Sequence, residues 1–239
     1  MNAKELFQAG KLDEAVQALT AEVRDHPTDA ARRTFLFELL CFTGDYSRAE
    51  KHLEVVAQAG GNHALGSLLY RAALNAEKTR LETFDQKRYK MSGSEVAPSP
   101  PGALNGKRFE SLSDADPRVG PRLEVFAAGS YLWIPFEHLA SIEMPPPRRL
   151  RDLLWSPAVV HTGPSFKGVE LGEVLLPALS PFSWQSAEDG VRLGRMTAWV
   201  EDENGEEIPL GQKMLVMDGE EIPFLELRKL EFAASQAAP

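Results

Sequence analysis

The chain has 239 residues, which is enough for two modest domains, and its 43% hydrophobic and 26% charged residues match ordinary soluble domains. Residues 1–90 hold 13 basic and 13 acidic residues, so the whole formal net charge of −9 lies in the rest of the chain. An acidic second half disfavours nonspecific binding to nucleic acids, which requires Lys and Arg to displace phosphate counterions.

Two features of the sequence indicate its compartment. Cys41 is the only cysteine, which excludes an intramolecular disulfide and fits a reducing environment. Residues 1–10 contain no apolar signal segment, and no apolar run approaches the roughly 18–20 residues that span a bilayer. We therefore expect a cytoplasmic protein.

An internal repeat opens the chain. The segment 10–15, Gly-Lys-Leu-Asp-Glu-Ala, aligns with the segment 44–49, Gly-Asp-Tyr-Ser-Arg-Ala, which lies 34 residues later. This period is typical of tetratricopeptide repeats (TPR), whose unit is a helix–turn–helix. Gly10 and Gly44 are expected in the tight turn within each unit, where a Cβ obstructs the chain. Each segment ends in an alanine small enough for paired helices to approach closely.

The apolar spacing and the turn residues predict five helices in this half. They are expected at residues 2–9, 12–25, 29–42, 46–58 and 63–89. These helices amount to about two and a half units, and arrays shorter than about three units are usually unstable alone. We therefore predict a TPR-like helical-repeat domain over residues 1–90, capped by its last helix or by the domain that follows.

The pattern changes after residue 90. Residues 91–107 are rich in Pro, Gly and Ser and are predicted to form a linker or a long exposed loop. Residues 108–239 are predicted to form a mainly β domain with one short helix at 150–155. Strands are expected at residues 123–127, 131–136, 158–161, 169–176, 192–200, 212–217 and 224–232. The predicted fold class is therefore an α+β multidomain chain.

No pattern in the chain indicates catalysis, a cofactor or a metal. There is no phosphate-binding glycine loop and no Cys-x-x-Cys, and the five histidines lack the spacing of zinc ligands. Asp114, Asp116 and Arg118 allow either a metal loop or acid pair, or a turn in which both carboxylates accept backbone N–H bonds and the arginine pairs with one of them. We favour the turn. His138, near Glu143, fits proton transfer less well than a hydrogen-bonded position at a strand end.

The segment 148–155, Arg-Arg-Leu-Arg-Asp-Leu-Leu-Trp, also allows two interpretations. It is either an exposed basic docking helix or an amphipathic helix packed on the sheet through its leucines and Trp155. We favour packing, and we expect Arg148 and Arg149 to remain free to face a partner.

Five runs of residues resemble one protein family. They lie at 33–45, 114–121, 131–136, 149–158 and 192–199, in order over nearly the whole chain. The runs are similar to those of the ImpE/TagJ (SciE-type) accessory proteins of type VI secretion, and the stretch 149–158 is the most specific. The resemblance implies a cytoplasmic, non-enzymatic adaptor that binds the N-terminal helix of the small sheath subunit (TssB-like). It also implies a role in sheath assembly and recycling with the ClpV ATPase, and it brings no catalytic residues.

The repeat supplies candidate partner-binding residues, because the first helix of each TPR unit lines a groove that binds extended or helical segments. The expected contact residues are Thr34, Glu38, Cys41, Leu65, Leu68 and Ala72, with Arg148 and Arg149 as further candidates in the β-rich half. The three apolar residues of the fifth helix fit packing on neighbouring helices equally well. Two other functions stay open: a secretion chaperone for another cargo, and an enzyme or effector with a site near Asp114, Asp116 and His138.

Overall fold

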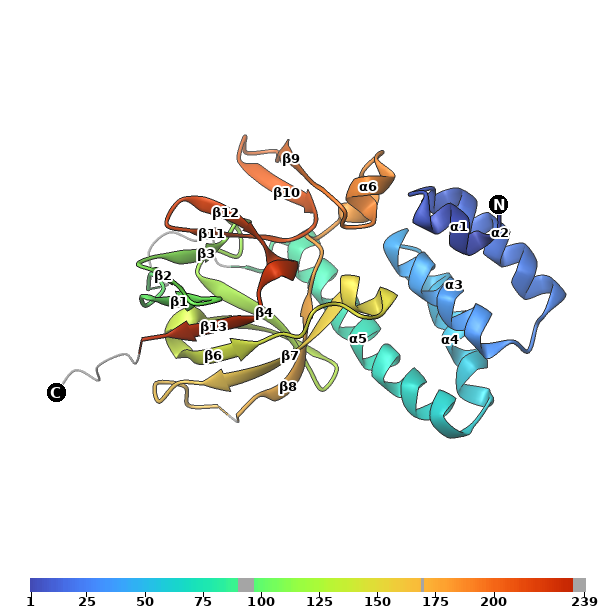
Figure 1. Cartoon of the computed structure of the whole chain (residues 1–239), viewed down its shortest axis with the longest axis horizontal. Helices are drawn as coiled ribbons and strands as arrows, with labels where there is room; N and C mark the ends of the chain where they lie inside the picture. The colour runs from blue at the N-terminus through green and yellow to red at the C-terminus, as the bar shows by residue number, and fades with distance from the viewer. Residues whose placement is uncertain (90–96, 169, 234–239) are drawn as a thin grey trace.

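The computed structural model describes residues 1–89, 97–168 and 170–233 and begins with five helices (Figure 1). They are α1 (Ala3–Gln8), α2 (Leu12–Asp25), α3 (Ala30–Phe42), α4 (Tyr46–Gln58) and α5 (Gly61–Asp85). Each lies within a few residues of a predicted helix, and consecutive helices pack on one another, so the helical repeat is confirmed. Among the described helices, none is both long and apolar enough to cross a membrane.

The two repeat turns depend on glycine. Gly10 and Gly44 have φ angles of +77° and +73°, a region that residues with a Cβ rarely adopt. A Cβ on Gly44 would also lie 2.5 Å from the ring of Trp184, and one on Gly10 would lie 3.3 Å from Arg195. Asp45 then caps α4 by accepting the backbone N–H three residues later. The turns are therefore also the points at which the second half of the chain approaches the repeat.

The described residues of the second half form thirteen strands in three antiparallel sheets (Figure 1). The largest sheet has the order β2-β1-β13-β6-β7-β8-β4-β5, a smaller one has the order β12-β11-β3, and β9 and β10 form a two-stranded ribbon. The strands are β1 (Gly102–Leu104), β2 (Lys107–Phe109), β3 (Leu112–Asp114), β4 (Arg122–Ala127), β5 (Ser130–Pro135), β6 (Leu139–Glu143), β7 (Trp155–Thr162), β8 (Gly172–Pro177), β9 (Thr197–Glu201), β10 (Glu207–Gly211), β11 (Met214–Met217), β12 (Glu220–Pro223) and β13 (Lys229–Phe232). The mainly β second half and the α+β class are confirmed.

The predicted linker is too long. Strand β1 and the first residue of β2 fall inside the range 91–107, while residues 91–96 lie outside the described residues. Gly102 belongs to a strand because β1 pairs with β13, and a Cβ there would lie 2.2 Å from the carbonyl oxygen of Glu231. The glycine that indicated a flexible segment is instead required by a close approach of two backbones.

Three other predicted elements differ from the structure. The predicted helix at 150–155 is the 3-10 helix η2 (Leu150–Leu153), and Trp155 already begins β7, where it pairs with Pro177 of β8. The predicted strand at 192–200 is split into the short helix α6 (Asp189–Arg192) and β9, because Gly194 turns the chain between them with φ of +65°. The predicted strand at 224–232 begins as the 3-10 helix η4 (Phe224–Glu226), and only its end forms β13.

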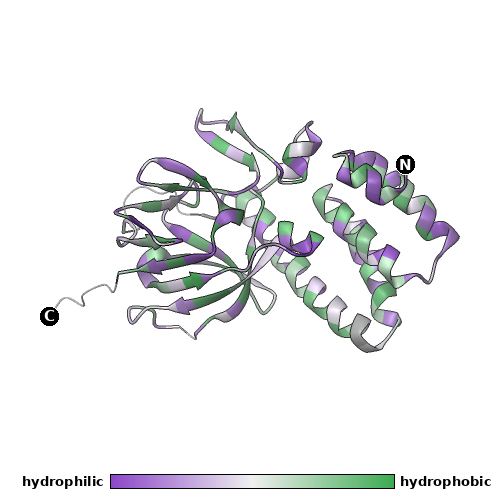
Figure 2. Ribbon diagram, viewed as in Figure 1, coloured by the Kyte–Doolittle hydropathy of each residue, from purple (hydrophilic) through white to green (hydrophobic). Residues whose placement is uncertain are grey.

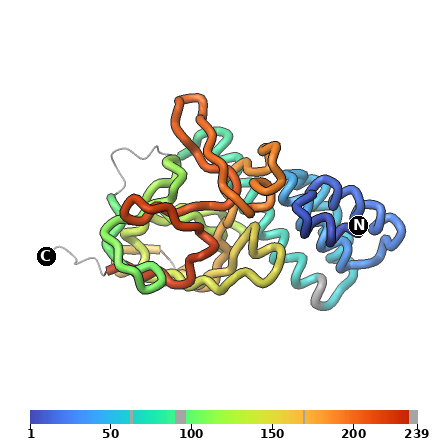
Figure 3. Tube along the Cα trace, turned by 45° about the horizontal axis from the view of Figure 1, so that its top comes forward, coloured from blue at the N-terminus to red at the C-terminus, as the bar shows by residue number. Residues whose placement is uncertain are grey.

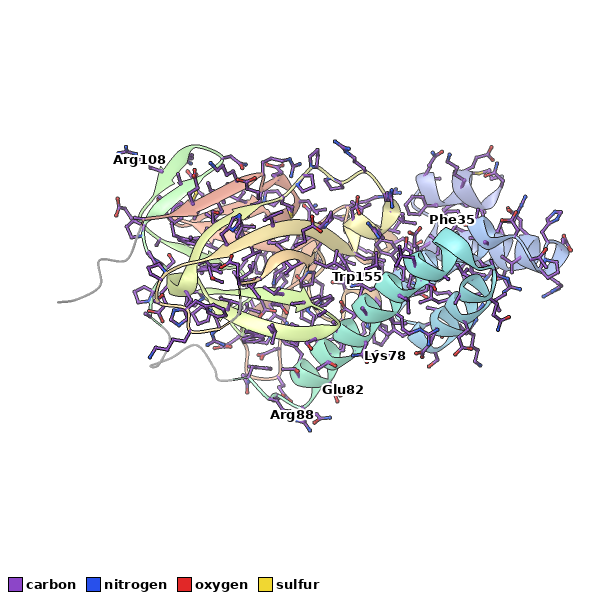
Figure 4. The ribbon with its side chains drawn as sticks, turned by 90° about the horizontal axis from the view of Figure 1, so that it is seen from below. Phe35, Lys78, Glu82, Arg88, Arg108 and Trp155 are labelled. Atoms are coloured by element: carbon purple, nitrogen blue, oxygen red, sulfur yellow. The ribbon has the colours of Figure 1, made fainter. Side chains whose placement is uncertain are left out.

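The two halves share one hydrophobic core. The cluster built by α1 to α5 extends into the second half through Phe126, Leu154, Trp155 and Leu193. Trp155 is 2% exposed, and its ring lies between the sheet and the helices (Figure 4). Its centroid is 6.4 Å from that of Phe37. The β-rich half therefore caps the short repeat array, which is one of the two caps that the sequence left open, while a second core lies between the sheets.

Candidate partner-binding site

The first half of α5 leaves three large apolar side chains in solvent. Leu65, Leu68 and Leu69 are 63%, 62% and 57% exposed. Residues spaced three and four apart share one side of a helix, so these leucines form one surface, the α5 leucine face. Hydrophobic residues run along α5 and the strands beside it (Figure 2). Contiguous exposed apolar surface is uncommon on soluble proteins and marks interaction sites.

A groove of about 450 Å³ continues from the α5 leucine face across to the large sheet. We call it the α5–sheet groove, and Leu69 belongs to both surfaces. Its walls are mostly apolar side chains of α5, β4, β7 and β8. The lining residues are Leu69, Ala72, Ala73, Phe126, Ala128, Gly129, Pro145, Arg151, Pro157, Ala158, Val159, Glu173, Val174 and Leu175. An apolar concavity with few polar groups is the usual form of a binding site.

A second hollow, of about 560 Å³, lies beside the turn between β4 and β5. Leu68 and Ala72 line it together with Gly129, whose carbonyl accepts a hydrogen bond of 3.0 Å from the Asn75 side-chain amide. Because both hollows share Ala72 and Gly129, they form one continuous surface around the exposed leucines.

Charged side chains of both signs lie on or near this surface. Arg151 lines the α5–sheet groove, and its guanidinium carbon lies 5.7 Å from the centre of the Tyr70 ring. Arg148 and Arg149 are exposed on the same segment, and their backbone N–H groups each donate to the Asp152 carboxylate at 2.9 Å. On α5, Arg71 lines the second hollow. The lining also contains Glu173 in the groove and Glu50, which pairs with Lys78, in the second hollow. Arg71 and Arg151 are the lining side chains that suit acidic groups on a partner.

The structure brings together only part of the predicted contact set. Leu65, Leu68 and Ala72 share the α5 surface, but Glu38 and Cys41 are 8% and 3% exposed and belong to the interior. The Glu38 carboxylate accepts a hydrogen bond of 2.5 Å from the Tyr70 hydroxyl. Burial raises the pKa of Glu38, although the hydrogen bond from Tyr70 acts to lower it. Burial also raises the pKa of the Cys41 thiol.

Thr34 is half-buried and uses its hydroxyl within α3, where Oγ1 donates to the Ala30 carbonyl at 2.8 Å. Together with the burial of Glu38 and Cys41, this leaves the three predicted α3 residues outside the α5 surface. The physical reason is that η2 and Trp155 cover this side of α3. The segment 148–155 is therefore packed, as favoured, although it packs on the helices as well as on the sheet.

A buried ionic network that was not predicted from the sequence joins α5 to the β-rich half. The Arg80 guanidinium, 1% exposed, donates to the two Glu124 carboxylate oxygens at 2.7 and 3.1 Å. It also donates to Glu77 at 3.2 Å and to the Leu179 carbonyl at 2.9 Å. The signal in the sequence is weak but present, because Arg80 occupies the same helical stripe as the buried alanines of α5.

Lys213 extends this network by pairing with both Glu124 and Asp114. Burial alone raises the pKa of Glu124, but Arg80 and Lys213 outweigh it, so the pKa of this carboxyl lies well below its ordinary value. Burial raises the pKa of Asp114 to about 6, although Lys213 opposes the shift. The network fixes how α5 sits on the sheet and therefore the shape of the groove.

The acidic turn has the predicted structure. The Asp114 and Asp116 carboxylates accept backbone N–H bonds from residues two positions later, at 2.9 and 3.0 Å. Arg118 pairs with Asp116 through two hydrogen bonds of 2.8 and 2.6 Å. His138 contacts Ser165, with Nδ1 and Oγ 2.9 Å apart. Within the described ranges no three His, Cys, Asp or Glu side chains are grouped so that they could hold a metal ion.

Comparison with known proteins agrees with this architecture. The family model "ImpE protein" matches residues 106–231, and a tetratricopeptide-repeat model matches residues 6–73. The type VI secretion system accessory component TagJ of Pseudomonas aeruginosa is 32% identical to this chain, over 99% of this chain and 93% of that protein. A crystal structure of a protein from Vibrio parahaemolyticus shares the fold, with a TM-score of 0.84 over 98% of each chain and 21% identity. The chain therefore belongs to the ImpE family of type VI secretion accessory proteins.

Proposed function

We propose that this chain is a non-enzymatic adaptor of type VI secretion whose α5 leucine face and α5–sheet groove bind one amphipathic helix. The observation that carries the proposal is the continuity of three exposed leucines with an apolar groove. Helices bind to such grooves through apolar residues spaced three and four apart. The chain's kinship with TagJ, an accessory component, supports an adaptor role.

The energetics fit a moderate, reversible complex. Fully burying one leucine contributes about 1.5–3 kcal/mol, so covering the exposed part of Leu65, Leu68 and Leu69 contributes about 3–5 kcal/mol. The partner's own apolar residues add to this, and the loss of translational freedom and the ordering of side chains subtract from it. We expect micromolar affinity, about −8 kcal/mol.

The partner we propose is the N-terminal helix of the small sheath subunit (TssB-like), as the family resemblance implies. Arg71 and Arg151 line the two hollows and add a criterion that the resemblance does not supply, since acidic residues beside the helix's apolar stripe would face them. Binding of this helix would place the chain on the sheath, where it would assist assembly and recycling with the ClpV ATPase.

Amide hydrogen exchange of the intact chain, with and without the sheath-subunit peptide, locates the contact. We expect the peptide to slow exchange in the first half of α5 and in β7 and β8. A separate hollow of about 580 Å³ lies around Phe35, between α1, α2 and α3. Slower exchange around Phe35 with none in α5 would contradict the proposed site.

A further inference from the structure

The β9–β10 ribbon is a second feature that the helix-binding proposal does not use. It projects from the body of the molecule (Figure 3). Within the described part of the chain β9 pairs with β10 alone. One long edge of β9 is therefore open, and an open edge presents backbone donors and acceptors to another strand.

The register identifies which backbone groups face outward. The Gln212 N–H donates to the Met196 carbonyl, and the Asp202 N–H donates to the Glu206 carbonyl. In an antiparallel pair, hydrogen-bonded and non-hydrogen-bonded positions alternate, so even-numbered residues of β9 bond to β10. The N–H and C=O groups of Thr197, Trp199 and Glu201 consequently point to the open edge. Pro209, opposite Trp199, fits this register because its position needs no N–H.

The side chains of the ribbon indicate the chemistry of a partner. Trp199 and Val200 are each 37% exposed, which gives an extended segment apolar contacts on both faces. Glu201 lies directly opposite Glu207, and both are exposed. Like charges at such positions are destabilising, and no cation pairs with either carboxylate in the described part of the chain. A lysine or arginine placed beside them would relieve the repulsion.

We propose that the open edge of β9 takes up an extended, basic segment of a partner protein as a third strand of the ribbon. The backbone groups of Thr197, Trp199 and Glu201 supply the hydrogen bonds, and the carboxylates supply the charge preference. A second copy of this chain is disfavoured as the occupant, because pairing two β9 edges brings two acidic ribbons together. The ribbon is separate from the first half of α5 (Figure 1), so both sites can be occupied at once.

Fluorescence anisotropy with the full chain and a labelled peptide of alternating Lys and Val, about eight residues long, tests this proposal. A matching peptide of alternating Glu and Val is the control. We expect the Lys–Val peptide to bind at least about tenfold more tightly than this control. Two further peptides carry N-methyl groups on every Lys or on every Val. Because only alternate N–H groups of an added strand face β9, the two should differ in affinity by about tenfold. Equal affinity for both, or no binding at about 1 mM peptide, would overturn strand addition.

Two charge-reversed variants locate the site. Glu201→Lys should weaken binding of the Lys–Val peptide by about tenfold while removing the repulsion with Glu207. Glu54→Lys, on the exposed surface of α4, changes the net charge equally and should leave the affinity within about twofold. Equal losses in the two variants would mean general charge attraction and would overturn the site. Leu68→Asp should leave the affinity for the Lys–Val peptide unchanged, so this experiment tests the ribbon site independently of the helix-binding site.

Discussion

Replacing Arg80 with methionine tests the junction that shapes the groove. The guanidinium donates two hydrogen bonds to Glu124 and two more to its neighbours, and the cation and the carboxylate are each 1% exposed. Methionine keeps much of the aliphatic stem but, among the residues that the structure describes, leaves Lys213 as the one cation paired with Glu124. Removing one partner of a buried ion pair lowers the free energy of unfolding by about 3–5 kcal/mol. We expect a loss near the lower end, because Lys213 remains.

Lys78→Met is the matched control on the same helix. Lys78 pairs with Glu50 at 2.7 Å, but these side chains are 37% and 39% exposed, and exposed pairs contribute about 0–1 kcal/mol. Urea unfolding followed by circular dichroism gives the midpoint and the slope for each variant, and their product is the free energy of unfolding. Equal losses for Arg80→Met and Lys78→Met would refute the role assigned to the buried network.

A double variant separates loss of packing from loss of charge balance. In Arg80→Met the Glu124 carboxylate keeps one cation, and Glu124→Gln removes that carboxylate. The double variant should therefore lose less stability than the sum of the losses of the two single variants. Coupled residues in one network commonly differ from additivity by about 0.5–3 kcal/mol. Additive losses would show that the two side chains act independently.

Three further predictions concern the turns and the carboxylates. Gly44→Val should lower stability by at least about 1–3 kcal/mol, because of the positive φ of Gly44 and the contact with Trp184. The loss should exceed that of Gly60→Val, where φ is +74° but nothing lies within 4 Å of an added Cβ. Equal melting temperatures of the two variants would refute this. The raised pKa of Glu38 means that the folded state binds its proton more tightly, so the free energy of unfolding should fall as pH rises from 4.5 towards the folded pKa. Glu38→Gln should lack that fall in urea titrations at several pH values, and an unchanged pH profile would count against it. Excess calcium, magnesium or zinc should leave the melting temperature unchanged, since the acidic turn is satisfied internally; an upward shift abolished by Asp116→Asn would restore the metal interpretation.

The helical half could be predicted because its signals are local. Gly10 and Gly44 mark turns within their own units, and Asp45 caps the helix that begins at the next residue. The β-rich half was predicted only as a set of strands. The pairing of β1 with β13 joins residues more than a hundred positions apart, and no local pattern encodes it. Gly102 therefore indicated a linker although its backbone lies against Glu231.

The candidate site could be predicted in part on α5 but not on the sheet, for a related reason. The stripe containing Leu68 was visible, but the sequence did not show which part of it the β-rich half covers. Glu38 and Cys41 were assigned to a contact surface because α3 resembles a groove-lining helix, and a segment over a hundred residues later covers them. The sheet side of the groove, at Phe126 and Leu175, was missed because it exists only after β4 and β8 pair.

Calorimetric titration of the intact chain with the N-terminal helix peptide of the small sheath subunit tests whether the α5 leucine face binds that helix. Leu68→Asp places a carboxylate in the contact, where it would be desolvated without a partner. Val200→Asp makes the same kind of change at an exposed apolar residue of the β9–β10 ribbon and serves as the matched control. Circular dichroism confirms that both variants are folded before titration.

We expect micromolar binding, about −8 kcal/mol, for the unmodified chain and for Val200→Asp, and no detectable binding for Leu68→Asp. Absence of heat at high micromolar peptide with the folded, unmodified chain would contradict the adaptor function. Undiminished binding by Leu68→Asp would remove the helix from the α5 leucine face.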